Sequence, residues 1–217
     1  ETLQTGDLLF FAGSSAEDFM IEALDVAAGD PPYSHVGMVI RDGSELYFWD
    51  APGGGNIFRD PYAARPRNRL HAIGITSHPG CRVAPLDLVL TYYMKILGGH
   101  FWVRHLTPSV TREQFHALRI FIDRVDGLPF PIPVETALPA NYAAGQKGIT
   151  LFAGTYFCAQ LAADSYLHMG VLSADQWPAN SYSPGALASS DPAKLPLVPP
   201  FALGDPIYVA WGSAHDR

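Results

Sequence analysis

The chain has 217 residues, and its 14 Lys and Arg against 21 Asp and Glu give a formal charge of −7 at pH 7. This charge argues against a nucleic-acid binder, which needs a basic face for the phosphates, and a 48% apolar share excludes a disordered chain. Two cysteines are too few for a disulfide scaffold or a cysteine-rich zinc site, and no apolar run reaches the roughly 18 residues of a transmembrane helix.

The length predicts a single domain over residues 1–217. No signal peptide is recognisable in the first residues, so the compartment is left open, with a bacterial periplasmic or extracellular location favoured over the cytoplasm. The oligomeric state is left open as well.

The first elements are a strand and a helix. Residues 6–12 (GDLLFFA) are a short apolar run, which predicts a buried strand. Ser14 and Glu17 have the spacing of a capping box, which predicts that a helix begins there. Gly29 follows the last apolar residue of this stretch and is expected to end the helix in a left-handed conformation.

A β-hairpin is predicted next. Residues 34–41 and 44–51 are rich in strand-forming side chains, and the Asp-Gly pair between them is typical of a two-residue type I′ turn. This turn implies a register in which paired residue numbers sum to 85. His35 and Asp50 would then lie directly opposite each other on one face of the hairpin, with Cβ atoms roughly 4.5–5.5 Å apart.

Two helices are predicted in the rest of the chain, among further strands and loops. Residues 111–125 begin with a Thr-x-x-Gln capping box and carry an apolar stripe. Residues 155–170 form the second helix, in which Thr155 as N-cap would place Cys158 at the third helical position. The remaining expectations are strands over residues 70–76, 82–89, 100–106 and 206–211, an ambiguous stretch over 90–97, and Pro-rich loops over 52–68, 127–154 and 177–205. Since helices and strands are segregated, α+β is favoured over a parallel sheet.

Cys158 is the leading candidate nucleophile. A thiol in the first turn of a helix faces unpaired backbone N–H groups and the positive end of the helix dipole, both of which favour the thiolate. His35 could accept its proton, and Asp50 could orient the imidazole, which completes the parts of a covalent acyl-transfer site. The alternatives are a small buried hydrophobic residue for Cys158 and a merely structural His–Asp pair.

No cofactor or metal is expected. The other histidines are scattered, and the chain has neither an HExxH motif nor paired CxxC motifs. Cys81 lies beside a Pro-Gly turn and is interpreted as structural, although the sequence leaves open a disulfide with Cys158.

Several sequence blocks, taken in order, resemble a known family. GDLLFF, YSHVGMVI, ELYFWDA and YFCAQLAADSYLHMG resemble the circularly permuted branch of the NlpC-like, papain-fold superfamily, which includes the YiiX-like proteins and, more distantly, lecithin retinol acyltransferase. The resemblance covers nearly the whole chain. It implies a permuted papain-like α+β fold, in which an antiparallel sheet or barrel packs against a helical layer that carries the nucleophile. By this likeness Cys158 is the nucleophile, His35 the base and Asp50 the third polar residue.

The chain departs from the family pattern at two positions. Ala159 stands where the family has Ser after the cysteine, and Phe130 stands where a Tyr is typical. If that tyrosine assists the oxyanion in relatives, Tyr156 or Tyr33 would have to substitute for it here.

The resemblance implies a cysteine hydrolase, namely an amidase or peptidase, with cell-wall peptides among its substrates. The alternatives are a lipid acyl hydrolase or acyltransferase that uses the same site, and a non-catalytic binding domain. Partners would be a small peptide, a cell-wall fragment or an acylated molecule. Aromatic side chains could line an acyl pocket or belong to the core; they are Phe48, Trp49, Tyr92, Tyr93, Phe101, Trp102 and Phe130.

Overall fold

The computed structural model describes residues 2–13, 16–53, 80–96, 100–131 and 134–209. The predicted strand over 70–76, most of the loop over 52–68 and the Ser14 cap lie outside these residues. None of the helices in the described ranges is both long and apolar enough to span a bilayer.

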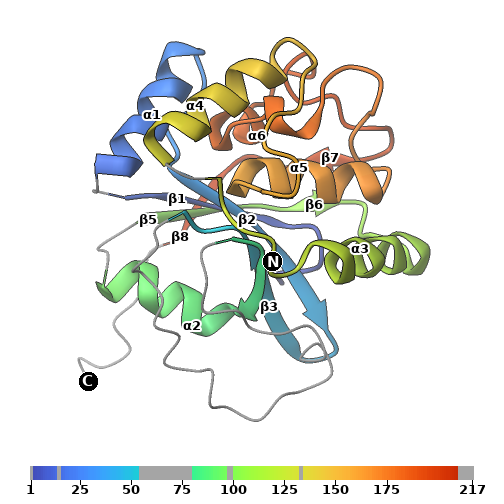
Figure 1. Ribbon diagram of the computed structural model, residues 1–217. Coiled ribbons are helices and arrows are strands. Elements are labelled where there is room, and N and C mark those ends of the chain that lie inside the picture. The colour runs from blue at the N-terminus through green and yellow to red at the C-terminus, as the bar shows by residue number, and fades with distance from the viewer. Residues whose placement is uncertain (1, 14–15, 54–79, 97–99, 132–133, 210–217) are drawn as a thin grey trace.

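The core of the fold is an open antiparallel sheet of six strands in the order β4-β3-β2-β1-β5-β8 (Figure 1). Its strands are β1 Leu8–Ala12, β2 His35–Asp42, β3 Glu45–Asp50, β4 Arg82–Pro85, β5 His100–Arg104 and β8 Ile207–Val209. A separate pair consists of β6 Leu106–Thr107 and β7 Ala202–Leu203. Of the two expected forms, sheet and barrel, the described strands therefore adopt the open sheet.

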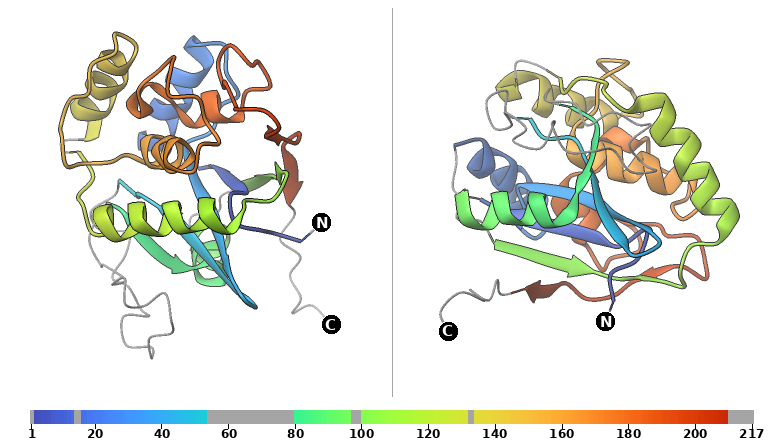
Figure 2. Two further views of the ribbon diagram at one scale, coloured as in Figure 1. Left: turned by 90° about the vertical axis from the view of Figure 1, so that its right-hand side faces the viewer. Right: turned by 90° about the horizontal axis from the view of Figure 1, so that it is seen from below.

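Helices cover both faces of this sheet (Figures 1 and 2). One layer contains α1 Ala16–Ala27, α3 Arg112–Val125, α4 Val134–Gly145, α5 Cys158–His168, the short helix η3 Ala179–Ser181 and α6 Pro184–Ala188. The other face is covered by α2 Leu86–Thr91 and the π-helical turn η2 Tyr92–Ile96. This double cover explains the continuous apolar run of β1, because Leu8 and Phe10 pack in one core cluster while Leu9 and Phe11 pack in the other.

The hairpin forms, but its predicted register is wrong. Met38 pairs with Trp49, so paired numbers sum to 87 rather than 85. The turn is Gly43-Ser44, and Gly43 at φ 63° occupies the first central position, as a type II′ turn requires. Because the two registers differ by two, every side chain keeps its predicted face. His35 and Asp50 are consequently diagonal neighbours rather than directly opposite.

Three segments expected to be extended or irregular are partly helical. The loop predicted over 177–205 contains η3 and α6, and β7 as well. The strand predicted over 82–89 ends at Pro85, where α2 begins. The loop predicted over 127–154 contains α4, although Pro139 lies inside this helix and removes one backbone donor at a cost of about 3 kcal/mol. Burial of Ala137 and Leu138 helps to offset that cost.

The predicted ends of two helices and one strand can be compared with the structure. The capping box of α3 is confirmed, since Thr111 and Gln114 make both reciprocal hydrogen bonds. Gly29 ends α1 with a positive φ of 72°, as expected. The strand predicted over 100–106 is interrupted at His105, between β5 and β6, and the ambiguous stretch over 90–97 includes η2.

Candidate active site

Cys158 is the first residue of α5, not the third as predicted. The N-cap is Phe157, whose extended backbone starts the helix without a side-chain cap. Thr155, the expected cap, instead donates its hydroxyl to the Phe152 carbonyl oxygen at 2.7 Å. The first-turn N–H groups therefore receive no acceptor from the N-cap side chain, and the nearly buried Cys158 lies beside them.

His35 and Asp50 meet at the end of the central hairpin. His35 begins β2, Asp50 ends β3, and the His35 Nε2 to Asp50 Oδ2 distance is 3.0 Å. The Cys158 side chain lies close enough to the His35 imidazole to raise its pKa. Because Asp50 holds Nε2, Nδ1 is the nitrogen left for sulfur. Thiol, imidazole and carboxylate, the three predicted site residues, are thus neighbours in the fold.

Arg82 is a fourth member of this cluster, which the sequence reasoning missed. It lies on β4 opposite Asp50, and its guanidinium reaches both carboxylate oxygens, at 2.9 Å from Nε and 3.2 Å from Nη2. Both side chains are buried. Burial, the largest single effect, raises the pKa of Asp50, but the charges of Arg82 and His35 outweigh it and the pKa is lowered overall. Asp50 is therefore an anion clamped between two cationic partners.

The surroundings of His35 favour its protonated form. Burial acts to lower the pKa of His35, but the negative charges of Cys158 and Asp50 and their hydrogen bonds raise it to about 9. The imidazole stacks on the Tyr93 ring, with centroids 5.5 Å apart, and lies near Phe11. The aromatic rings hold the imidazole in place, and the Asp50 carboxylate stabilises its charge.

The tyrosines predicted to assist the oxyanion have other partners. The Tyr156 hydroxyl donates to Asp164 at 2.8 Å. The Tyr33 ring packs between Phe10 and Trp102, with both centroid distances 5.1 Å. No interaction among the described residues joins either tyrosine to the thiol. The two departures from the family pattern, at residues 130 and 159, are both buried in the core.

A network of buried amides supports the start of α5. Gln160, two residues after the thiol, accepts a hydrogen bond from Asn141 Nδ2 at 3.2 Å. Asn180 in turn donates to both the carbonyl and the side-chain oxygen of Asn141, at 2.8 and 3.0 Å. The network joins α4, α5 and η3 and holds the cysteine-bearing turn against its neighbours. No local pattern could have revealed it, because the amides come from three separate segments.

A small apolar pocket opens beside the thiol. It lies between α1, α4 and the start of α6, and its lining consists of Ile21, Leu24, Leu138, Tyr142, Phe157, Cys158, Ser183 and Pro184. The aromatic residues that the sequence offered for such a pocket are not among these; Phe48, Trp49, Phe101 and Phe130 are buried in the core. Helix side chains, not strand aromatics, therefore shape the space next to sulfur.

The second cysteine, Cys81, is not part of this candidate site. Cys81 and Cys158 are both free, so the disulfide left open by the sequence is not formed. Burial and the negative charges of Asp126 and Asp50 raise the pKa of the Cys81 thiol far above its ordinary value. Cys81 is a neutral core side chain, in agreement with its structural interpretation.

Comparison with known proteins gives a structural relationship only. No family model and no curated protein sequence matches this chain. Among solved structures, the fold resembles the crystal structure of metalloprotein YiiX from Escherichia coli O157:H7, a DUF1105 protein, with a TM-score of 0.50. The match has 17% sequence identity and covers 78% of this chain and 67% of that chain. The protein is thus of the α+β class with an open antiparallel sheet. Within that class its fold is YiiX-like.

Proposed function

We propose that this protein is a cysteine hydrolase that cleaves an amide or ester through an acyl-enzyme. The observation that carries the proposal is the contact between Cys158, at the N-terminus of α5, and His35, whose other ring nitrogen is bonded to Asp50. A nucleophile, a base and a group that orients the base are the elements of covalent acyl transfer. The chain order, with the histidine before the cysteine, agrees with the circularly permuted NlpC-like, papain-fold proteins.

The proposed reaction uses this chain's own residues. The Cys158 thiolate attacks the substrate carbonyl carbon, and the Cys158 backbone N–H stabilises the oxyanion, an interaction worth roughly 3 kcal/mol per donor. His35 then gives its proton to the leaving nitrogen or oxygen as the bond to carbon breaks, which leaves a thioester on sulfur. Water, deprotonated by His35, hydrolyses the thioester and restores the thiol. Asp50, held by Arg82, keeps the imidazole oriented throughout.

The YiiX structure is described as that of a metalloprotein, which raises the question of a metal site in this chain. Among the described residues, no group of three or more His, Cys, Asp or Glu side chains could hold a metal ion. The Asp50 carboxylate is already engaged by Arg82 and His35. The described residues therefore do not fit a metal, and the proposed reaction has no metal-dependent step.

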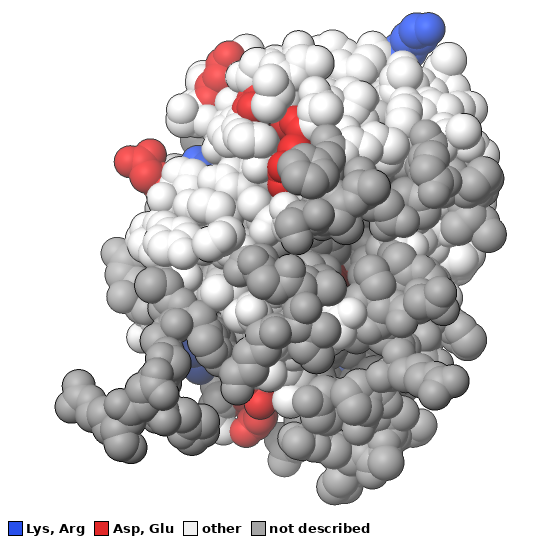
Figure 3. Space-filling model, turned by 90° about the vertical axis from the view of Figure 1, so that its left-hand side faces the viewer, with Lys and Arg blue, Asp and Glu red and all other residues white. Residues whose placement is uncertain are grey.

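The proposed substrate is an amide, with cell-wall peptides as the leading class. The net charge of −7 disfavours binding to the anionic polymers of a cell wall, so charge attraction would not bring the protein to such a surface. Figure 3 shows the molecule from the left-hand side of Figure 1. On this face the described residues present more acidic than basic side chains. A short peptide fragment, rather than a charged wall surface, fits this charge distribution.

A second candidate function, hydrolysis of lipid acyl esters, is favoured by the apolar pocket beside Cys158. Ile21, Leu24 and Leu138 would receive the hydrocarbon part of an acyl group while its carbonyl lies at sulfur. The two candidates differ in product. Release of fatty acid from a model ester, with no fragment released from cell-wall peptides, would establish the second.

The proposal is tested by alkylation of Cys158 with iodoacetamide between pH 4 and pH 10. We expect rapid labelling well below pH 8.5, the ordinary thiol pKa, because the thiolate is paired with the protonated His35. In His35→Ala the labelling profile should move toward that ordinary value. His105→Ala is a matched control, since His105 forms a similar pair with the buried Asp7, at 2.8 Å.

A wild-type profile that follows an ordinary thiol and does not change in His35→Ala would refute the proposed ion pair. A second measurement separates turnover from binding. If activated esters give no burst of acyl-enzyme although labelling behaves as expected, the chain is a binding domain that retains the site, and the hydrolase proposal fails.

A further inference from the structure

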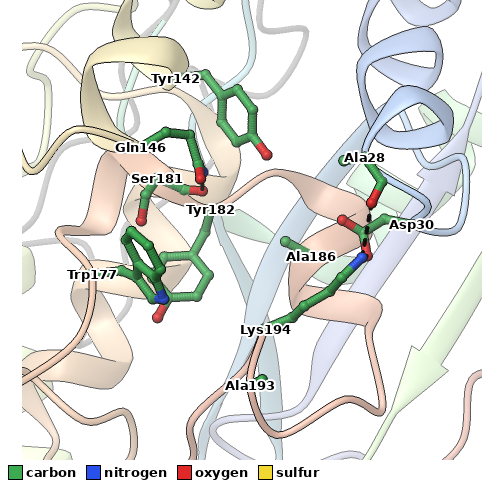
Figure 4. Close-up of a pocket in the computed structure, with 10 residues that line it drawn as sticks. All are labelled: Ala28, Asp30, Tyr142, Gln146, Trp177, Ser181, Tyr182, Ala186, Ala193 and Lys194. Carbon is green, nitrogen blue, oxygen red and sulfur yellow. Dashed lines mark hydrogen bonds and ion pairs between the residues drawn. The ribbon is translucent and has the colours of Figure 1, made fainter.

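A second pocket lies next to the apolar pocket. It has an empty volume of about 560 Å³ and is lined by residues of α4, η3 and α6 and of the segments that follow α1 and α6 (Figure 4). Tyr142 lines both pockets. Residues 181–182 line the second pocket and residues 183–184 line the apolar one, so the two pockets are neighbours in the fold.

One wall of this second pocket combines aromatic rings with hydrogen-bonding groups. In Figure 4, Tyr142, Trp177 and Tyr182 lie together on one side, with the Gln146 amide between them. Trp177 is 39% exposed, which is high for an indole and leaves part of its surface for a ligand. The Tyr182 side chain is 1% exposed, and its hydroxyl has no hydrogen-bond partner within the described part of the chain. Because that hydroxyl is itself fully buried, Tyr182 contributes packing to this wall rather than a polar group that a ligand could reach.

The opposite wall carries two charges that cancel each other. Lys194 Nζ lies 2.7 Å from Asp30 Oδ1 and 2.9 Å from the Ala28 carbonyl oxygen at the end of α1 (Figure 4). The ammonium is therefore engaged by the protein. A ligand ammonium would meet Lys194, and a ligand carboxylate would meet Asp30, so either charge would face a like charge at close range. The wall instead suits neutral groups that donate to the carboxylate.

We propose that this second pocket binds a sugar ring, a neutral group with one apolar C–H face and several hydroxyls. The apolar face would pack on Trp177, while the hydroxyls would bond to Asp30. Aromatic walls with a few well-placed polar groups are the usual composition of a small-molecule site. That the sugar belongs to the substrate cleaved at Cys158 rests on the proposed function, but the binding itself does not.

The experiment is an NMR titration of the Trp177 indole N–H signal with three sugars of the same ring: glucose, glucosamine and glucuronate, at pH 6.5. We expect saturable binding of glucose and at least tenfold weaker binding of the two charged sugars. Trp177→Ala, followed by ligand-detected saturation transfer, should weaken glucose binding at least tenfold, and Asp30→Asn should weaken it severalfold. The Asp30→Asn change keeps the shape of the side chain, so it tests the carboxylate without a cavity.

Two controls separate this proposal from the hydrolase. Tyr208→Ala removes an aromatic side chain that is 50% exposed on β8, outside the pocket, and should leave glucose affinity unchanged. Cys158→Ala should also bind glucose normally, whether or not the protein is an enzyme. Absence of saturable glucose binding, equal or tighter binding of either charged sugar, or unchanged affinity in both Trp177→Ala and Asp30→Asn would overturn the proposal.

Discussion

The buried ion pair between Asp50 and Arg82 leads to a quantitative prediction about stability. The two side chains are 0% and 4% exposed and are joined by two hydrogen bonds, so their opposite charges compensate each other at close range. Arg82→Met leaves the Asp50 carboxylate with His35 alone, while Asp50→Asn removes the carboxylate that both hydrogen bonds of the guanidinium reach. Breaking a buried pair from one side costs about 3–5 kcal/mol.

The double variant Asp50→Asn/Arg82→Met should be far less destabilised than the sum of its single variants. Each single variant is expected to lose about 4 kcal/mol of the free energy of unfolding. Since the double variant removes both charges, we expect a coupling free energy of at least about 2 kcal/mol between the two changes. Urea unfolding of the four proteins at pH 7 gives the free energies of unfolding. The same cycle on Asp30 and Lys194, whose lysine is 35% exposed, is the matched control and should couple by less than about 1 kcal/mol. Additive single variants at Asp50 and Arg82 would refute the reasoning.

Two further changes test the packing of the helical layer. The Asp25 carboxyl is fully buried, and burial raises its pKa from 3.8 to about 7, so the folded state keeps a proton that the unfolded chain releases between these pH values. The free energy of unfolding of the wild type should therefore fall as pH rises through this window, by up to about 4 kcal/mol. Asp25→Asn should not show this loss. If urea titrations give a difference in free energy of unfolding between the wild type and Asp25→Asn that stays constant from pH 4 to pH 7, the prediction is wrong. Gly145→Ala should destabilise the protein by about 1–3 kcal/mol, because a Cβ there would lie 2.6 Å from the Asn180 carbonyl, and an unchanged melting temperature would show that the chain relaxes around it.

Predictions that depended on neighbours in the chain were the most successful. The capping box of α3 needs only Thr111 and Gln114, three residues apart, and both of its bonds are present. The pairing of His35 with Asp50 was predicted from a register that proved wrong by two. It nevertheless holds at 3.0 Å, because a shift of two preserves the face of each side chain and diagonal neighbours remain within reach.

Local signals failed where packing outweighed them. Thr155 has the better capping side chain, yet α5 begins after Phe157, whose ring is buried in the core. The Pro139 signal for a loop was likewise overruled, and the residues around it form a helix whose Leu138 and Tyr142 line the site. In both cases the burial of apolar side chains against other elements contributes more than the local preference.

The sequence by itself predicted the candidate residues Cys158, His35 and Asp50 and the face of the hairpin on which His35 and Asp50 lie, because the strand period is a property of a short segment. Only the tertiary structure decided that Arg82 clamps Asp50, that Cys158 reaches His35, and that the adjoining pockets are formed by helices distant along the chain. Such contacts join segments separated by tens of residues. They depend on how the whole layer packs against the sheet, and no short stretch of sequence contains that information.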